Sequence, residues 1–268
     1  MNPASQYVEV ISNTKLSNQL WWIDFHSESI SNNAQPGQFV HMLNSEGDDP
    51  LLRRPYSLSS IDPDRESASI LYHVVGRGSE WLSNCSPGDK IDTIGPLGSP
   101  FTVLSDTRHL LMLGGGIGMG PLIALANQYA SEHTKTIILN GARSLHGITP
   151  RKFIPKQSNL LTATDDGSLG HQGTVVDLLA DNYHWADQIF ACGPTPMLRA
   201  IDHKINHIDH TPSDKRKSVQ FALEARMACG IGICYSCVVA TKSGPKRVCY
   251  EGPVFPMTNL TWDWQTGI

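Results

Sequence analysis

The sequence predicts a multi-domain protein, in which an antiparallel β-barrel precedes an α/β domain with a parallel sheet and a small C-terminal metal-binding segment. Three observations predict it. Short apolar runs alternate with turn residues over 1–103, strand-like and helix-like runs alternate over 104–214, and cysteine and glycine concentrate in 215–268. A chain of 268 residues, of which 40% are hydrophobic, is long enough for two or three cores.

The expected barrel rests on short apolar runs that are bounded by Gly, Pro, Asn and Asp. Runs of this length between turn residues are typical of the strands of an antiparallel barrel or sandwich. They occupy residues 7–13, 20–27, 37–43, 56–62, 67–76 and 88–95.

The expected parallel sheet rests on strand and helix patterns that follow each other along the chain. Apolar strand-like runs cover 109–115, 136–142, 159–167 and 188–194, and helix-like stretches cover 120–133 and 173–182. Strands that alternate with helices form parallel sheets with crossover helices. We therefore expect the carboxyl ends of these strands to share one edge of the sheet.

The C-terminal segment holds four of the six cysteines, Cys229, Cys234, Cys237 and Cys249. The spacing C-x4-C-x2-C with a distant fourth cysteine is that of a plant-type [2Fe–2S] loop. Small residues between the thiols let backbone amides approach the sulfur atoms, and Asp and Glu are absent between Ala225 and Ala240. The alternatives are a zinc site or a packed cluster of reduced thiols. Cys85 lies apart and is expected to be a small buried apolar residue.

Three turns at strand ends are candidates for nucleotide binding. The glycine-rich turn Gly114–Gly118 joins a strand to a helix, where backbone N–H groups attract phosphate. Its spacing departs from G-x-G-x-x-G, so a simple tight turn is the alternative. Cys192–Pro194 ends another strand on the same side, and Asp165 and Asp166 end a third, where an Asx cap would also explain them.

The stretch from Arg54 to Ser57 is a candidate flavin contact in the barrel. An arginine fork can hold a pyrophosphate, and the ring of Tyr56 can stack on a flat cofactor. A strand that merely carries surface arginines is the alternative.

Composition restricts the partners and the location. The net charge is −4 and the chain has no basic run, so we do not expect nucleic acid as a partner. No stretch has the roughly 18 to 20 continuous apolar residues that span a bilayer. The first residues also lack the pattern of a secretory signal, and we therefore expect a cytoplasmic protein without membrane contact.

Taken in order, the motifs resemble the ferredoxin reductase superfamily. RPYS, GRGS, GPLGSPF, GGGIGMGP, ACGPTPM and the terminal C-x4-C-x2-C…C follow one another as they do in the branch with a C-terminal cluster. Nearly the whole chain is similar to the electron-transfer subunits of NAD-linked type B dihydroorotate dehydrogenases, most closely in TATDDGSLGHQGTVVDLL and VCYEGPVF.

The resemblance implies FAD, NAD and a [2Fe–2S] cluster as cofactors, with specific residues for each. For FAD these are Arg54, Pro55, Tyr56, Ser57, Leu71, Tyr72, His73, Gly78 and Ser79. For NAD they are Gly114, Gly115, Gly116, Ile117, Gly118, Asp166, Gly193 and Pro194, with Cys192 as the catalytic residue beside the nicotinamide. The iron ligands would be Cys229, Cys234, Cys237 and Cys249. Relatives often carry arginine where His73 stands, so the contact at this position is expected to be weaker or pH-dependent.

The resemblance also implies a partner. A catalytic subunit with FMN would oxidise dihydroorotate in de novo pyrimidine biosynthesis, and this chain would pass the electrons to NAD+, in a heterotetramer with two copies of each subunit. The small subunit of a sulfide dehydrogenase or of an NADPH:ferredoxin oxidoreductase shares every motif, and a non-catalytic zinc module is a third possibility. Arg143 after a strand leaves NADP open as the nucleotide.

Overall fold

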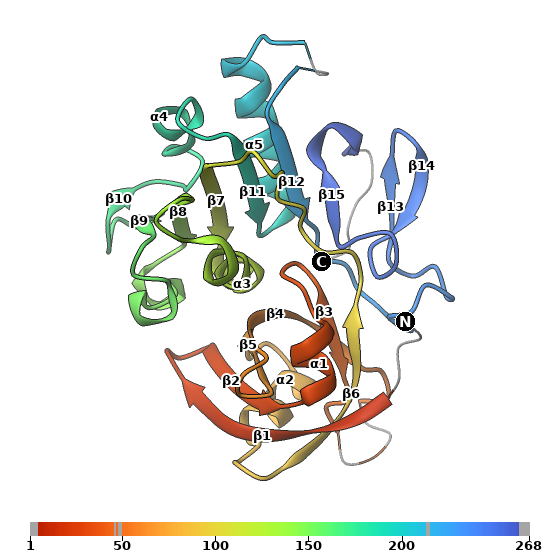
Figure 1. Ribbon diagram of the computed structural model, residues 1–268. Coiled ribbons are helices and arrows are strands. Elements are labelled where there is room, and N and C mark those ends of the chain that lie inside the picture. Colours follow the sequence, from red (N-terminus) through yellow and green to blue (C-terminus); the bar gives the residue numbers. More distant parts are fainter. Residues whose placement is uncertain (1–4, 46, 48–49, 213–214, 263–268) are drawn as a thin grey trace.

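The computed structural model describes residues 5–45, 47, 50–212 and 215–262. An N-terminal barrel and an α/β domain lie side by side, and the C-terminal segment returns along the edge of the α/β sheet to reach the barrel (Figure 1). None of the helices in these residues combines the length and apolarity that crossing a lipid bilayer requires.

The barrel is closed and antiparallel, with the strand order β1-β2-β5-β4-β3-β6, which confirms the barrel and decides against a sandwich. Its strands are β1 (Ser5–Lys15), β2 (Leu20–His26), β3 (Phe39–Met42), β4 (Arg54–Asp62), β5 (Ser67–His73) and β6 (Lys90–Leu97). Two short helices accompany it, α1 (Glu28–Asn33) and α2 (Arg77–Ser83). Alternate side chains of these strands, among them Ile23, Phe25 and Ile70, fill the interior. Cys85 is buried against this core, as expected.

The α/β domain contains a seven-stranded sheet with the order β10-β9-β8-β7-β11-β12-β15. All neighbouring pairs are parallel except β12 with β15, which confirms the predicted parallel sheet. The strands are β7 (His109–Gly115), β8 (Lys135–Ala142), β9 (Asn159–Thr164), β10 (His171–Gln172), β11 (Gln188–Cys192), β12 (Ser218–Ala222) and β15 (Val254–Pro256).

Helix α3 (Met119–Tyr129) lies between the sheet and the barrel (Figure 1). Its first eight residues are all buried, and its core cluster includes both Leu110 of the sheet and Trp22 of the barrel. A helix that is apolar on every side is stable only when it is covered on every side. The helix therefore fixes the glycine turn at its N-terminus against the barrel.

Two helices differ from the sequence expectation. The stretch 173–182 was expected to be helical, but α4 covers only Leu179–Tyr183. Before α4 the chain forms turns whose hydrogen bonds span three residues, from Asp177 N to Thr174 O and from Leu179 N to Val176 O, and the Asp177 carboxylate also accepts from Thr174. Helix α5 (Thr195–Ile208) was not anticipated; it begins directly after Pro194.

The C-terminal segment is built into the rest of the molecule. Strands β12 and β15 belong to the large sheet, and between them the chain forms the cysteine-rich loop and the hairpin of β13 (Val238–Thr241) and β14 (Gly244–Arg247). One core cluster joins Phe39 of the barrel, Phe221 of the sheet and Cys249. Residues 215–268 thus contribute two strands to the sheet as well as the cysteine-rich loop.

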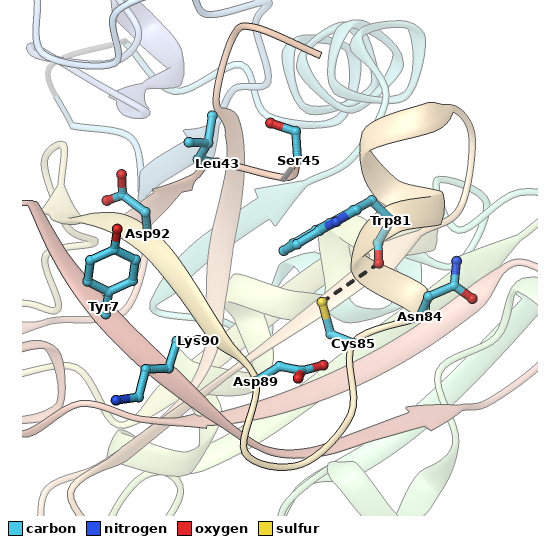
Figure 2. Close-up of a pocket in the computed structure, with 9 residues that line it drawn as sticks. All are labelled: Tyr7, Leu43, Ser45, Trp81, Asn84, Cys85, Asp89, Lys90 and Asp92. Atoms are coloured by element: carbon cyan, nitrogen blue, oxygen red, sulfur yellow. Dashed lines mark hydrogen bonds between the residues drawn. The ribbon is translucent and has the colours of Figure 1, made fainter. Parts of the chain in front are cut away.

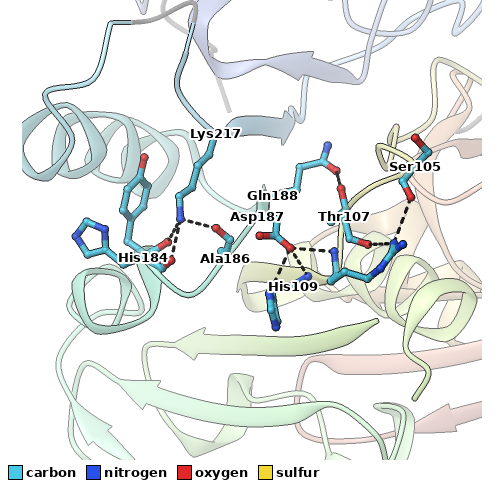
Figure 3. Close-up of polar contacts among 10 residues, drawn as sticks. Ser105, Thr107, His109, His184, Ala186, Asp187, Gln188 and Lys217 are labelled. Atoms are coloured by element: carbon cyan, nitrogen blue, oxygen red, sulfur yellow. Dashed lines mark hydrogen bonds and ion pairs between the residues drawn. The ribbon is translucent and has the colours of Figure 1, made fainter. Parts of the chain in front are cut away.

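The edge of the sheet where the parallel strands begin is held by polar side chains (Figure 3). Gln188, which is fully buried, accepts from Leu104 N and Thr107 Oγ1 and donates to Thr102 O at 2.8 Å. Asp187 accepts from the backbone N–H groups of Arg108 and His109. These bonds fasten the segment that leaves the barrel, so the opposite edge remains for the candidate site.

Replacing Gln188 with leucine is expected to lower the free energy of unfolding by about 3 kcal/mol, because two or more buried polar groups lose their partners at about 1–3 kcal/mol each. Gln172→Leu on the exposed edge strand β10 is the matched control and is expected to stay within about 0.5 kcal/mol. Urea unfolding followed by circular dichroism measures both. Equal midpoints for the two variants would contradict the structural role of Gln188.

Candidate redox site

The glycine turn and the Cys192–Pro194 turn meet at the carboxyl edge of the sheet. Gly114 and Cys192 are register partners in β7 and β11. A Cβ atom built on Gly118 would lie 2.2 Å from the carbonyl oxygen of Cys192, and one on Gly115 would lie 3.1 Å from Cδ of Pro194. Only glycine permits this contact, which brings together two of the predicted nucleotide turns.

The glycine turn also has an open side. Gly116 adopts φ +56°, and no atom lies within 4 Å of a Cβ built on it. The turn continues through Gly116–Gly118 as a 3-10 helix into α3, so its backbone N–H groups stand at a helix start. This side of the turn is open to a ligand, and binding of a dinucleotide phosphate there stays a prediction.

Asp166 lies at the end of β9 and shapes a turn. Its Oδ1 accepts from the backbone N–H of Ser168 at 3.0 Å and from the Ser168 hydroxyl at 2.6 Å. These hydrogen bonds lower the pKa of the Asp166 carboxyl. The Asx cap that the sequence left open is therefore present, and a role in nucleotide binding stays a prediction.

Cys192 is buried beside a carboxyl group that sequence reasoning missed. Burial, together with the nearby Glu224, raises the pKa of the Cys192 thiol, so the thiol is neutral. Glu224 follows β12, the strand next to β11, and burial raises the pKa of its carboxyl as well. A glutamate directly after a buried apolar strand was the sequence signal that could have identified it.

The predicted flavin strand β4 contacts the start of α2. Nε of Arg54 lies 3.5 Å from the position of a Cβ on Gly78, and Asn44 joins the two elements by donating to the Tyr56 hydroxyl at 2.6 Å and to Gly78 O at 3.1 Å. The hydroxyl of Ser79 accepts from Gly76 N. Arg54, Tyr56, Gly78 and Ser79 are thus neighbours, and a role for the Arg54 guanidinium in binding the FAD pyrophosphate stays a prediction.

The three residues at the end of β5 point in two directions. The ring of Tyr72 lies inside the barrel, where its hydroxyl donates to Asn13 Oδ1 at 2.9 Å, so only its backbone is left to face a flavin. Leu71 is buried on the opposite face, toward α3. Burial lowers the pKa of His73, which is therefore neutral at pH 7.

The four C-terminal cysteines lie together, and backbone N–H groups point at their sulfur atoms. Gly232 N donates to Cys249 Sγ at 3.2 Å, and Cys249 N donates to Cys237 Sγ at 3.4 Å. Cys229 Sγ accepts from two further amides, those of Ile233 at 3.3 Å and Cys234 at 3.4 Å. Such bonds stabilise thiolates and are the surroundings that an iron–sulfur cluster requires.

The thiols form two pairs that differ in exposure. Cys237 and Cys249 are both 3% exposed, and their mutual hydrogen bond lowers the pKa of Cys237 to about 6 and raises that of Cys249. In the second pair Cys234 is exposed; the Ser236 hydroxyl, with a smaller contribution from Cys229, lowers the pKa of Cys234 to about 6. In the described residues no three ligand-type side chains converge on a single ion. Two pairs match the two irons of a [2Fe–2S] rhomb.

His41 joins the barrel to the cysteine-rich loop and was also missed from sequence. It is fully buried in β3, opposite Pro55 of β4, and its Nδ1 lies 2.3 Å from the position of a Cβ on Gly230. Neither ring nitrogen has a hydrogen-bond partner among the described residues, and burial lowers the pKa of His41 to about 4. A glycine with φ +69° at 230 is therefore needed for the loop to pack on the barrel.

A pocket of about 580 Å³ lies elsewhere, on the side of the barrel between α2 and β6 (Figure 2). It is lined by Tyr7, Leu43, Ser45, Trp81, Asn84, Cys85, Asp89, Lys90 and Asp92. None of the predicted cofactor residues is among them, so this pocket is distinct from the candidate site.

Comparison with known proteins agrees with this architecture. Residues 224–261 match the family described as the iron-sulfur cluster binding domain of dihydroorotate dehydrogenase B. A chain from the solved structure of an NADH-dependent reduced ferredoxin–NADP oxidoreductase, studied for flavin-based electron bifurcation, superimposes with a TM-score of 0.84 at 27% identity, over 98% of this chain and 92% of that one. The ferredoxin reductase of carbazole 1,9a-dioxygenase, at 22% identity and a TM-score of 0.67, shares the fold over 82% of this chain and 69% of its own.

Curated relatives extend over nearly the whole chain. The dihydroorotate dehydrogenase B (NAD(+)) electron transfer subunit of Desulforamulus reducens is 36% identical, over 91% of this chain and 93% of that protein. The subunit of the same name from Fusobacterium nucleatum is 35% identical, over 92% and 94%. They confirm the predicted superfamily, the oxidoreductase class and the electron-transfer role. The chain belongs to the family of dihydroorotate dehydrogenase B (NAD(+)) electron transfer subunits.

Proposed function

We propose that this chain carries electrons from the FMN-containing catalytic subunit of a dihydroorotate dehydrogenase to NAD+, through a [2Fe–2S] cluster and FAD, in pyrimidine biosynthesis. One observation supports it above all others, namely that the three candidate sites adjoin β3 or β4, two neighbouring strands of the barrel. A Cβ on Gly120, next to the glycine turn, would lie 2.6 Å from Ser59 of β4, and the cysteine-rich loop packs on His41 of β3. Short distances between cofactors are what electron transfer needs.

Different residues of the chain would bind the cluster, FAD and the dinucleotide. Cys229 with Cys234 and Cys237 with Cys249 would hold the cluster, Arg54 with Gly78 and Ser79 the FAD pyrophosphate, and the Gly114–Gly118 turn the dinucleotide. When bound, a flavin exchanges hydride with nicotinamide and single electrons with an iron–sulfur centre. A chain that joins these two kinds of carrier therefore needs a flavin. Cys192, whose buried thiol is neutral, would line the nicotinamide position, with the Glu224 carboxyl beside it.

The assembly follows from the same proposal. The catalytic partner would dock near the exposed thiol pair, in a heterotetramer with two copies of each subunit. The segments 1–103, 104–214 and 215–268 would bind FAD, NAD and the cluster in turn, with β12 and β15 of the last segment completing the NAD-binding sheet. Cytoplasmic location stays a prediction.

The test is anaerobic and uses the holoprotein. It is mixed with the dihydroorotate dehydrogenase catalytic subunit of the same organism, dihydroorotate and NAD+ are added, and absorbance at the NADH band is followed. NADH that forms only with both chains present supports the proposal. A holoprotein that reduces dyes with NADH but forms no NADH from dihydroorotate would overturn it.

A second candidate is favoured by the structural match to the reduced ferredoxin–NADP oxidoreductase chain, which covers 98% of this chain. In that function the partner would supply electrons from reduced ferredoxin in place of dihydroorotate. Reduction of NAD+ or NADP+ by reduced ferredoxin, with no response to dihydroorotate, would identify it.

Replacing His73 with arginine is expected to tighten FAD binding about tenfold to a hundredfold, because a charge-assisted hydrogen bond contributes roughly 1.5–3 kcal/mol. The native imidazole is neutral at pH 7, since burial lowers its pKa below 6.5. Native affinity should accordingly rise as pH falls through that lowered pKa, whereas the arginine variant should show no such rise. Flavin fluorescence titration gives both dissociation constants. Identical values at pH 7 would place His73 out of contact with FAD.

A further inference from the structure

We propose that Arg247 is a positioning residue for the iron–sulfur cluster: it fixes the backbone around Gly232 so that one amide reaches a thiolate of each cysteine pair. The inference rests on the proposed function only in assuming that the four cysteines bind a [2Fe–2S] cluster. It assigns a role to an arginine two positions before the fourth cysteine, which neither motif nor spacing singled out.

The central contact is a hydrogen bond from Arg247 Nη1 to the carbonyl oxygen of Gly232, at 2.6 Å. That carbonyl shares its planar peptide group with the N–H of Ile233, which donates to Cys229 Sγ at 3.3 Å. A donor on the oxygen of a peptide fixes the plane and polarises the N–H on its other side. Arg247 therefore aims and strengthens an amide bond to the more exposed thiol pair.

The adjacent amide serves the buried pair. Gly232 N donates to Cys249 Sγ at 3.2 Å. Gly232 adopts φ +83°, a conformation that favours glycine. A Cβ at this position would lie 3.0 Å from Cβ of Tyr250, so the loop has no room to shift toward that side. Holding the Gly232 carbonyl thus also holds the N–H that points at the fourth cysteine.

Arg247 is itself rigid. Its Nε donates to Glu251 Oε2 at 3.0 Å and its Nη2 to Glu251 Oε1 at 2.6 Å, a two-point contact that fixes the guanidinium plane. The rings of Tyr235 and Tyr250 lie 4.9 and 4.6 Å from the guanidinium carbon, and the side chain is 19% exposed. Lysine has neither the fork nor the plane, so it cannot make this set of contacts.

The charge of Arg247 is balanced by Glu251 within the same contact. Its effect on the cluster should therefore come from geometry rather than from net positive charge. Fewer amide bonds to the thiolates stabilise the more negative, reduced cluster less, and the reduction potential should fall when the arginine is lost.

The experiment compares three variants of the reconstituted full-length protein. Arg247→Lys keeps the charge and loses the fork, Arg247→Gln loses both, and Lys246→Gln removes one charge from the neighbouring position as the matched control. The readouts are the midpoint potential of the cluster, the electron paramagnetic resonance spectrum of the reduced cluster, and the rate of iron loss to a chelator. Reduction of bound flavin by NADH reports whether each variant has folded.

Both Arg247 variants are expected to lower the potential, to shift the resonance spectrum and to lose iron faster, because loss of a group that supports metal ligands typically lowers metal affinity about ten- to a hundredfold. Lys246→Gln should match the native protein. The proposal is overturned if Arg247→Lys keeps the native potential and iron retention, or if Lys246→Gln shifts them as much as Arg247→Gln. A native chain that takes up no iron would instead be a failure of the proposed function, which the first reconstitution reveals.

Discussion

Replacing Cys249 with serine is expected to abolish coupled NADH formation from dihydroorotate while NADH still reduces the bound flavin. The thiol is 3% exposed and accepts a hydrogen bond from the Gly232 amide. It forms the buried pair with Cys237. A serine hydroxyl is a poor ligand for iron beside thiolates, so the cluster should be lost. The flavin and nucleotide contacts come from other segments and should remain.

Iron analysis, the visible spectrum of the cluster and the two assays measure this outcome. Cys85→Ser is the matched control, because Cys85 lies in the barrel core and should keep full iron content. If Cys249→Ser retained two irons per chain and coupled turnover, the assignment of the fourth ligand would be wrong. If both assays failed together, Cys249→Ser would be misfolded. The same test would then be made with Cys234→Ser, which changes an exposed thiol.

Replacing Gly118 with alanine is expected to destabilise the protein by about 3 kcal/mol, the upper end of the usual cost of overpacking. The added methyl group would lie 2.2 Å from the backbone oxygen of Cys192, which cannot rotate away as a side chain could. Both nucleotide turns would be forced apart. Thermal unfolding should therefore occur at a clearly lower temperature, and the KM for NADH should rise.

Gly116→Ala separates the loss of stability from the loss of NADH affinity. Its methyl group meets no atom within 4 Å, and the left-handed backbone at φ +56° costs roughly 1–2 kcal/mol with a side chain. We expect modest destabilisation but a marked loss of NADH affinity, because the methyl would enter the space assigned to the dinucleotide. Unchanged affinity in Gly116→Ala would move the nucleotide away from this turn.

The sequence predicted those parts of the molecule whose cause is local. The six barrel strands follow from short apolar runs between turn residues, and the thiol group follows from the spacing of Cys229, Cys234 and Cys237. The helix predicted over 173–182 was wrong in its first half, where the chain forms turns and the Asp177 carboxylate accepts two hydrogen bonds from Thr174.

Long-range contacts explain what was missed. In the sequence His41 is one residue of a barrel strand, and its contact with Gly230 exists only in the folded chain. Glu224 comes next to Cys192 only when β12 pairs with β11, and Arg247 reaches the Gly232 carbonyl only when the hairpin folds back on the cysteine-rich loop. Pairing between strands that are distant in sequence is set by packing, and no local pattern contains it.

The route of the chain through β12 and β15 determines how the cysteine-rich loop is attached. The cysteine-rich loop and its hairpin form an insertion whose two ends are held by an antiparallel ladder, with Phe221 opposite Phe255. None of the residues paired in this ladder is an iron ligand, and Phe221 and Phe255 share one apolar cluster with Cys237 and Cys249. Both ends of the loop are thus anchored by strand pairing, so loss of a single ligand should leave the loop attached to the sheet.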